Sequence, residues 1–286
     1  MEEILFTKMH GIGNDYIYIN CLTSTPPAIQ QLAQEMSRPH TGVGSDGIIL
    51  ICPSEVADFK MRIFNADGSE ARMCGNGSRC VGKYVADYGL TDSDEISLET
   101  LGGIKHITLH RDAEGRVCSA TVDMGLPVNQ PALVPVIAPS ADPLIEFPTA
   151  TLAGGMVKIT AVSMGNPHGV IFVDDLNQVD VHALGRELEL HPMWPDRANI
   201  EFAQIEGPQE IRMRVWERGS GETMACGTGA CATAVAAMLT GRVRSDRPVT
   251  VHLLGGDLTI EMRRDGSVMM TGPAETIYEG RYYRKS

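Results

Sequence analysis

Two short cysteine motifs carry the strongest chemical signal in this chain. Cys74-Gly75-Asn76-Gly77 and Cys226-Gly227-Thr228-Gly229 share the pattern Cys-Gly-x-Gly, and each stands just before a segment with helical spacing. A thiol at the start of a helix lies near the positive end of the helix dipole and near free backbone N–H groups, which favour the thiolate. The same N–H groups can bind a carboxylate, and the glycines let a ligand approach closely. Each motif is therefore predicted to supply an acid/base group and half of a carboxylate-binding cradle.

The two motifs are related by an internal repeat. An offset of 152 residues carries Cys74 onto Cys226 and Gly13-Asn14 onto Gly165-Asn166. It also aligns residues 60–64 with 212–216, and Glu70 with Glu222. One constant offset for several separated blocks indicates a duplication. Two matched thiols suit inversion at a carbon α to a carboxylate, because one thiolate can remove a proton from one face while the other thiol protonates the opposite face.

This chemistry needs no electron-sink cofactor, so the sequence predicts none. Backbone N–H groups at the two cradles can stabilise the charge that develops on the carboxylate in the transition state. The turn Gly11-Ile12-Gly13 is not a dinucleotide-binding fingerprint, because the third glycine and the following helix are missing. Two alternative roles of the cysteines stay open. They can be inert buried residues, or they can form a redox dithiol if they approach closely enough.

Composition limits the class of protein. With 286 residues, 43% of them hydrophobic and 21% charged, the chain has room for two globular domains. A net charge of −12 argues against a nucleic-acid partner, which normally requires a basic face. No apolar stretch approaches the roughly 18 residues that span a bilayer, and the N-terminus lacks the pattern of a signal peptide. We therefore expect a cytoplasmic protein with no membrane partner.

The seven cysteines indicate reduced thiols, because an odd count without a secretory signal is unlike a disulfide scaffold. The spacings Cys74-x5-Cys80 and Cys226-x4-Cys231 differ from the paired C-x2-C ligands of structural zinc sites, so no metal is predicted. The other three cysteines lie in apolar or strand-like stretches and are expected to be small core residues: Cys21, Cys52 and Cys118.

Strand and helix signals recur in the same order in both halves. In the first half, strands are predicted at 4–7, 16–19, 47–51, 59–64, 96–99, 104–109 and 117–123, and helices at 28–36 and 75–88. In the second half, strands are predicted at 156–162, 170–173, 200–205, 211–216, 249–253, 258–262 and 268–270, and helices at 181–188 and 227–239. Gly89 and Gly241 are expected to end the two matched helices.

The pattern predicts an α+β protein of two pseudo-symmetric domains, each a curved, mostly antiparallel sheet wrapped around a central helix. Residues 126–150 hold six prolines, a density that disfavours both helix and central strand, so they are expected to form a connecting segment. We assign residues 1–126 plus 273–286 to the domain that carries Cys74. Residues 127–272 form the domain that carries Cys226.

Longer motifs in both halves resemble the diaminopimelate epimerase family. The blocks are 8–15 (KMHGIGND), 64–70 (FNADGSE), 74–80 (CGNGSRC), 165–168 (GNPH), 217–223 (ERGSGET) and 225–229 (ACGTG). The resemblance runs from Lys8 to about Gly272. Taken together the blocks are specific, whereas any single one is also compatible with proline racemases and phenazine-pathway isomerases.

The resemblance implies the diaminopimelate epimerase-like fold and interconversion of LL- and meso-diaminopimelate without pyridoxal phosphate, on the route to lysine and peptidoglycan. It implies that Cys74 and Cys226 are the acid/base pair, that His168 and Glu217 assist proton movement, and that the protein is a homodimer. Gly75, Asn76, Gly227 and Thr228 would hold the reacting carboxylate. The remainder of the substrate would contact Asn14, Asn65, Asn166, Asn199, Glu217 and Arg218.

The residue chemistry agrees with that assignment. Diaminopimelate carries a carboxylate and an ammonium at each end; Arg218 can bind a carboxylate bidentately and Glu217 can accept from an ammonium. Single members can also have ordinary structural roles, since an Asn beside Gly often serves a turn and Glu70 and Glu222 can simply favour the next helix. Some relatives have Gln where this chain has Gly47, so we assign no contact to Gly47.

Two rival functions stay open. The same two-thiol chemistry can act on proline or hydroxyproline, although a cyclic imino acid has no distal charged end for Arg218 to bind. A thiol redox or metal-binding protein would use a Cys74–Cys226 disulfide or bound zinc as its working state. A substrate panel separates the first rival, and metal analysis with thiol titration separates the second.

Overall fold

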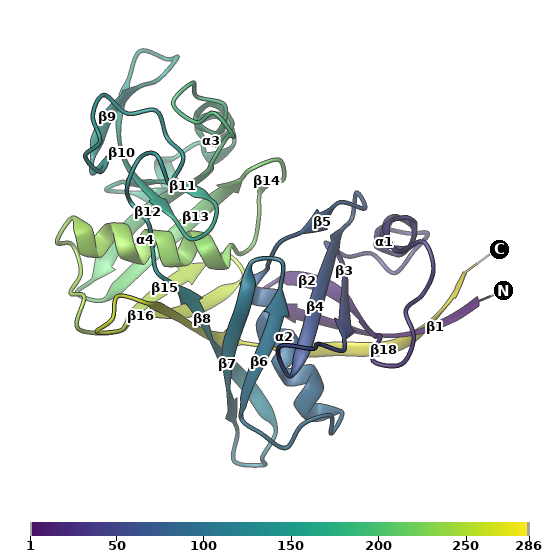
Figure 1. Cartoon of the computed structure of the whole chain (residues 1–286). Coiled ribbons are helices and arrows are strands. Elements are labelled where there is room, and N and C mark those ends of the chain that lie inside the picture. Colours follow the sequence, from purple (N-terminus) through teal and green to yellow (C-terminus); the bar gives the residue numbers. More distant parts are fainter. Residues whose placement is uncertain (1, 285–286) are drawn as a thin grey trace. The chain divides into compact units, whose positions relative to one another are not determined.

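The strands and helices follow one another in the same order twice along the chain (Figure 1). The computed structural model describes residues 2–284, and the chain divides into two compact units. The first consists of Met1–Asp123 with Thr271–Ser286, and the second of Met124–Met270. The four α-helices of the described residues match in pairs at the 152-residue offset: α1 (Ile29–Ser37) with α3 (Val181–Glu189), and α2 (Gly75–Asp87) with α4 (Gly227–Leu239).

In the first unit the strands pair in the spatial order β18, β1, β2, β3, β4, β6, β7, β8, with β5 on β4. Only the β2–β3 and β4–β6 pairs among these are parallel. The strands are β1 (Glu2–Gly11), β2 (Asn14–Asn20), β3 (Gly47–Cys52), β4 (Phe59–Asn65), β5 (Glu70–Ala71), β6 (Glu95–Thr100), β7 (Gly103–Arg111), β8 (Val117–Gly125) and β18 (Glu275–Arg284).

The second unit repeats the arrangement in the spatial order β9, β10, β11, β12, β13, β15, β16, with β14 on β13. The parallel pairs, β11–β12 and β13–β15, correspond to those of the first unit. The strands are β9 (Phe147–Ala150), β10 (Met156–Ser163), β11 (Pro167–Phe172), β12 (Asn199–Gly207), β13 (Glu210–Glu217), β14 (Gly221–Glu222), β15 (Val249–Leu253), β16 (Gly256–Met262) and β17 (Val268–Pro273); a short 3-10 helix covers Leu176–Gln178.

Each sheet surrounds one buried helix. Helix α2 contacts β1, β2, β7 and β18, and α4 contacts β10 to β13, β15 and β16. Nearly every residue of α4 is buried and its apolar side chains lie all round it, which is how a helix inside a core differs from an amphipathic surface helix. Gly89 and Gly241 follow α2 and α4 with φ of 62° and 70°, the left-handed conformation that ends helices. The predicted α+β fold is confirmed.

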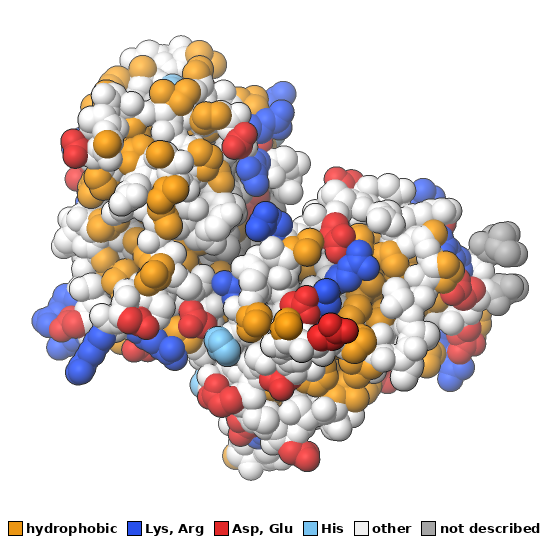
Figure 2. Space-filling view, viewed as in Figure 1, with side chains coloured by type: hydrophobic (Ala, Val, Ile, Leu, Met, Phe, Trp, Pro, Cys, Tyr) orange, Lys and Arg blue, Asp and Glu red, His pale blue; other side chains and the backbone are white. Residues whose placement is uncertain are grey.

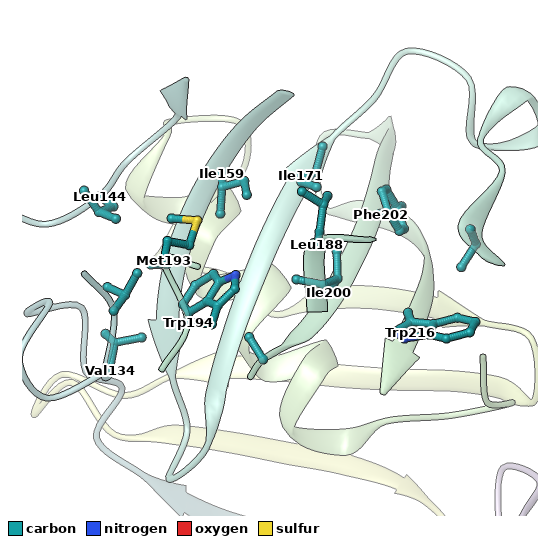
Figure 3. Packing of buried hydrophobic residues seen from close by; sticks show 14 of the residues in the cluster. Val134, Leu144, Ile159, Ile171, Leu188, Met193, Trp194, Ile200, Phe202 and Trp216 are labelled. Atoms are coloured by element: carbon teal, nitrogen blue, oxygen red, sulfur yellow. The ribbon is translucent and has the colours of Figure 1, made fainter. Parts of the chain in front are cut away.

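Helices α1 and α3 cover the opposite face of their sheets. In β3, Ile48 and Leu50 pack in the α1 cluster, while the alternate residue Ile49 lies against α2. In β12, Ile200 and Phe202 pack with Leu188 of α3 in the cluster shown in Figure 3. Side chains alternate between the faces of a strand, so a residue between two members of the outer cluster points to the central helix. This alternation decides where Glu201 lies.

Residues 126–150, predicted as a connecting segment, also contribute one short strand and part of the core of the second unit. Phe147–Ala150 forms β9, which pairs with β10, and Val134, Val136 and Leu144 are buried in the core of the second unit. Pro148 is compatible with β9 because β9 is a short strand paired with β10, and proline is tolerated on sheet edges. Hydrophobic side chains also gather on the face of this unit seen in Figure 2; the segment exposes Leu126, Leu133, Ile137 and Ile145.

The three cysteines expected in the core differ in their exposure to solvent. Cys21 and Cys52 are buried as predicted, but Cys118 is exposed, because its side chain points out from β8. Strand β18 was not predicted, since its exposed, charge-rich sequence lacks an apolar alternation. Within residues 2–284, no helix is both long and apolar enough to cross a membrane.

Candidate active site

Cys74 lies immediately before helix α2, as its N-cap. Its backbone is extended (φ −139°, ψ 117°), and its Sγ accepts a hydrogen bond from the N–H of Gly77 at 3.3 Å. The thiol donates to Oδ1 of Asn14 at 3.3 Å, and Nδ2 of Asn76 donates to the same oxygen at 3.4 Å. The structure thus brings together three of the residues predicted for this half of the site.

A carboxylate behind Asn14 fixes the orientation of its amide. Oδ2 of Asp46 accepts from Nδ2 of Asn14 at 2.7 Å and from the backbone N–H of Asp15 at 3.0 Å. Since a carboxylate only accepts, the NH2 group of Asn14 must face Asp46 and its oxygen must face Cys74. The pKa of Asp46 is raised, first by burial and then by the charge of Asp15. The hydrogen bonds from Asp15 and Asn14 and the charge of Lys8 act in the opposite direction but do not outweigh burial. Asp46 was not among the predicted residues.

Asn65 and Gly47 lie side by side at the ends of paired strands. They are partners in the β3–β4 register, and Nδ2 of Asn65 donates to Oγ of Ser69 in the turn that follows β4. A Cβ on Gly47 would lie 2.2 Å from the carbonyl oxygen of Phe64 and 2.9 Å from Cα of Asn65. The absence of a side chain at this position is therefore a packing requirement of this sheet.

Replacing Gly47 by alanine or glutamine is expected to destabilise the protein by about 1–3 kcal/mol, the usual cost of overpacking a core. The new Cβ meets backbone atoms, which cannot rotate away as a side chain can. The midpoint of urea unfolding measures the loss. Gly155→Ala is the control, because its Cβ would approach only a side-chain oxygen, Oγ1 of Thr151, at 3.2 Å. Equal midpoints for the two alanine variants would contradict the argument.

Cys226 occupies the equivalent place before α4. Its backbone is extended (φ −119°, ψ 109°), and its Sγ accepts from the N–H of Gly229 at 3.3 Å, the same distance as in the first unit. Burial, followed by the charges of Glu217 and Glu201, raises the pKa of this thiol well above its usual value. Hydrogen bonds from Thr228 and Gly229 act in the opposite direction. At Cys226 the N–H of Gly229 favours the thiolate as expected, but burial and two carboxylates outweigh this effect.

His168 connects two other polar residues of the second unit. Its Nδ1 lies 2.7 Å from Oε1 of Glu201, and its Nε2 lies 3.0 Å from Oδ1 of Asn166. Nδ2 of Asn166 donates to Oγ1 of Thr228 at 3.4 Å, and this hydroxyl lies 3.5 Å from Sγ of Cys226. The predicted residues Asn166, His168 and Thr228 thus form one chain with Cys226.

Glu217 ends strand β13 beside the thiol. The pKa of its carboxyl is raised, chiefly by burial. Hydrogen bonds from Thr223 and Cys226 and the nearby His168 act in the opposite direction without outweighing it. The carboxyl accepts from Oγ1 of Thr223 and from the Cys226 thiol. A buried carboxylate that accepts a hydrogen bond from a thiol can take part in acid/base chemistry.

Asn199 and Arg218 lie next to each other, but both ends of the Asn199 side-chain amide are hydrogen-bonded to backbone groups. Its Nδ2 donates to the carbonyl of Pro167 at 3.1 Å, and its Oδ1 accepts from the N–H of Arg218 at 2.9 Å. Glu189 accepts from the N–H of Gly219 at 3.0 Å and from Nε1 of Trp216 at 2.8 Å. These contacts fix the turn that presents Arg218, whose guanidinium is exposed and donates to the carbonyl of Asp196.

The matched glutamates outside the site have a structural role. Glu70 binds Arg62 through two hydrogen bonds, and Glu222 binds Arg214 in the same way at the 152-residue offset. Each pair links a short strand to its neighbour, so the glutamates do more than favour the start of the next helix. Among the described residues, no group of three or more His, Cys, Asp or Glu side chains is arranged to hold a metal ion.

Comparison with known sequences gives a consistent result. The sequence model of one family, described as diaminopimelate epimerase, matches residues 6–129 and 160–277. A diaminopimelate epimerase from Geobacillus kaustophilus is 48% identical over 285 residues, which are 99% of this chain and 98% of the relative. Another, from Phocaeicola vulgatus, is 54% identical over 279 residues, 97% of each chain.

More distant solved structures share the fold. A phenazine biosynthesis protein from Bacillus anthracis superposes with a TM-score of 0.72 at 17% identity, covering 99% of this chain and 100% of that one. A hydroxyproline epimerase from Agrobacterium vitis also gives 0.72, at 16% identity, covering 98% and 92%. At such identities the likeness shows the fold alone.

Proposed function

Because the chain belongs to the diaminopimelate epimerase family and is therefore an isomerase, we propose that it inverts the α carbon of diaminopimelate with Cys74 and Cys226 as base and acid and with no cofactor. The observation that carries this mechanism is the matched geometry of the two thiols. Each caps the N-terminus of a helix, and each accepts a hydrogen bond from the N–H three residues later at 3.3 Å. The duplication thus supplies two equivalent acid/base groups.

The reaction balances with these two groups alone. One cysteine, as thiolate, takes the α proton from one face of LL-diaminopimelate and becomes a thiol. The other cysteine, as thiol, gives its proton to the opposite face and becomes a thiolate, so meso-diaminopimelate forms with no net gain or loss of protons. The mechanism requires the two sulfurs to approach the same carbon from opposite sides.

The pKa of Cys226 supports a division of roles. Burial and the carboxylates of Glu217 and Glu201 raise the pKa of Cys226, which favours Cys226 as the group that enters the reaction as the acid. In that direction Cys74 would give up its proton, which it donates to Asn14, and serve as the base. The assignment applies to the direction of reaction that begins from this protonation state, and the roles exchange in the reverse direction.

The first turns of α2 and α4 would hold the reacting carboxylate. Helix N-termini direct backbone N–H groups outward, so those of Gly75, Asn76, Gly227 and Thr228 are suited to an anion. Charge that develops on the carboxylate as the α proton leaves would be stabilised there. His168 and Glu217 would assist proton movement at Cys226.

The distal end of the substrate would contact residues that differ between the repeats. Arg218 presents an exposed guanidinium for the distal carboxylate, and Glu217 can accept from an ammonium. The amides of Asn14, Asn65 and Asn166 can donate or accept as needed. Asn199 would act by holding the Arg218 turn, since its own amide already binds two backbone groups.

Incubation of LL-diaminopimelate in deuterated water tests the function. We expect meso product labelled with one deuterium at a single α carbon, with no cofactor added. The double variant Cys74→Ala/Cys226→Ala is the control and is expected to show neither exchange nor inversion. Wild-type enzyme that leaves the α proton unexchanged would contradict the proposal. Epimerisation of proline or hydroxyproline in place of diaminopimelate would assign the same chemistry to a different substrate.

The working form of the enzyme has two further expected properties. A cytoplasmic location suits a mechanism that needs free thiols, and none of the seven cysteines, all within the described range 2–284, takes part in a disulfide. The family resemblance implies a homodimer. Light scattering at micromolar concentration would give the mass, for which a dimer predicts twice 30.9 kDa.

A further inference from the structure

Glu201 is a buried carboxylate that the two-thiol mechanism does not use. It lies in β12 between Ile200 and Phe202, which belong to the outer core cluster, so its side chain points to the central helix α4. None of its surface is exposed to solvent. A Cβ on Gly229, the residue that donates to Cys226 Sγ, would lie 2.7 Å from Oε1 of Glu201. The carboxylate is therefore packed directly beneath the turn that holds the thiol.

A buried carboxylate is costly unless donors satisfy it. Oε1 of Glu201 is bonded to Nδ1 of His168 at 2.7 Å, whereas no group in the described part of the chain donates to Oε2. His168 is equally buried, with no exposed surface. The two side chains thus compensate each other in a site closed to water.

The first unit has no such pair at the matched positions. Ile49 corresponds to Glu201 at the 152-residue offset, and Tyr16 corresponds to His168. The packing is otherwise alike, because a Cβ on Gly77 would lie 2.6 Å from Cδ1 of Ile49. The duplication has therefore placed a carboxylate and an imidazole beneath one thiol, and an isoleucine and a tyrosine at the equivalent places in the other unit.

We propose that Glu201 is a positioning residue that keeps hydrogens on both ring nitrogens of His168 and thereby sets the direction of the hydrogen-bond chain through Asn166 and Thr228 to Cys226. Because Glu201 only accepts, Nδ1 of His168 carries a hydrogen. Because Oδ1 of Asn166 faces Nε2 at 3.0 Å, Nε2 carries one as well. Ring and carboxylate then form an ion pair.

Every donor in the chain consequently points toward the sulfur. His168 donates to Oδ1 of Asn166, whose NH2 group donates to Oγ1 of Thr228. The Thr228 hydroxyl is left to donate to Sγ of Cys226. When Cys226 has given up its proton, this hydroxyl and the N–H of Gly229 stabilise the thiolate. Without the hydrogen on Nε2, the Asn166 amide would turn over and the direction of the chain would reverse.

Nitrogen-15 NMR of the full-length protein labelled at histidine tests this directly. In the wild-type protein at neutral pH, both ring nitrogens of His168 are expected to carry hydrogens. In Glu201→Gln the neutral amide can still accept from Nδ1, but the charge is lost, so Nε2 is expected to lose its hydrogen. Glu206→Gln is the matched control, because Glu206 is an exposed glutamate of the same strand. An unchanged His168 spectrum in Glu201→Gln would overturn the proposal.

Alkylation of Cys226 by iodoacetamide, followed by mass spectrometry across pH, gives a second readout. The charged and titratable groups that face this thiol are Glu217 on β13, Glu201 on β12 and His168 on β11. In Glu201→Gln the His168 charge is lost together with that of Glu201, and the chain no longer donates to Sγ, so the onset of alkylation is expected to move to higher pH, while Glu206→Gln leaves it in place. If Glu201→Gln does not fold, Glu201→Ile, which copies the first unit, provides a substitute in both measurements.

The role of Glu201 rests on the proposed function of Cys226 as an acid/base group, but the role and the function are tested by separate measurements. If the wild-type enzyme shows no α-proton exchange, the function fails while the NMR result stands on its own. If exchange occurs, Glu201→Gln is expected to lower kcat/KM about 10- to 100-fold, the range for losing a buried hydrogen bond to a charged group. An unaltered kcat/KM with an unaltered His168 spectrum would leave Glu201 no positioning role.

Discussion

Serine in place of Cys74 or of Cys226 is expected to lower kcat for epimerisation by about 10²- to 10⁴-fold, the usual contribution of a positioned general acid or base. A hydroxyl keeps the shape and the N-cap hydrogen bond of the thiol, but it ionises far less readily. The loss should appear in kcat with little change in KM, because the carboxylate cradle of backbone N–H groups remains. Deuterium incorporation and inversion, followed together, measure it.

The chain offers matched controls for these variants. Cys80 and Cys231 lie inside the same two helices, where they are fully buried, and Cys118 lies on the surface. Their serine variants are expected to keep most of the wild-type kcat once circular dichroism shows them folded. Equal losses across all five cysteines would contradict the assignment of Cys74 and Cys226 as the reacting pair.

Variants with a single thiol also separate the roles. A protein that retains only one reacting cysteine can remove the α proton only from the face that this cysteine meets. Cys226→Ser and Cys74→Ser should therefore exchange different stereoisomers. Identical preferences would mean that the two sulfurs do not meet opposite faces of the α carbon.

The sequence predicted those parts of the fold that depend on local signals. Helices α2 and α4 begin after a capping cysteine and end before a glycine in the left-handed conformation, so their bounds could be read from the chain. Strand β9 could not, because its four residues include Pro148, and only pairing with β10 makes it a strand. Strand β18 is likewise formed by tertiary pairing with β1.

Within the site, sequence motifs predicted the groups nearest the chemistry but not the carboxylates behind them. Asp46 stands in a glycine-rich turn, where an aspartate usually serves the turn itself. Glu201 has a detectable signal, because it interrupts the apolar run Ile200-Glu201-Phe202-Ala203 in a strand whose first five residues are all buried. The raised pKa of Cys226 could not be predicted from its motif, since burial and the nearby carboxylates depend on the tertiary structure.

Glu217→Gln is expected to lower kcat/KM about 10²-fold and to move the alkaline limb of the pH profile of kcat/KM to lower pH. A mechanism that needs one thiolate and one thiol gives a bell-shaped profile whose two limbs belong to the pair. With Cys226 as the acid, activity is lost as pH rises through the pKa of this thiol. The Glu217 carboxylate raises that pKa, so removing its charge lowers the pKa and moves the alkaline limb to lower pH.

The dependence of kcat/KM on pH measures this shift. Glu210→Gln is the control, because Glu210 is an exposed residue of the same strand. An alkaline limb that stays in place would remove Glu217 from the environment of the acid. Glu201→Gln should move the limb to higher pH instead, because Sγ loses the hydrogen bond from Thr228, and the two variants also differ at His168. Glu217→Gln leaves the ion pair of His168 with Glu201 intact, so the hydrogen on Nε2 should persist. Opposite shifts of the limb, with opposite results at His168, therefore separate a carboxylate that acts on the thiol directly from one that acts through the imidazole.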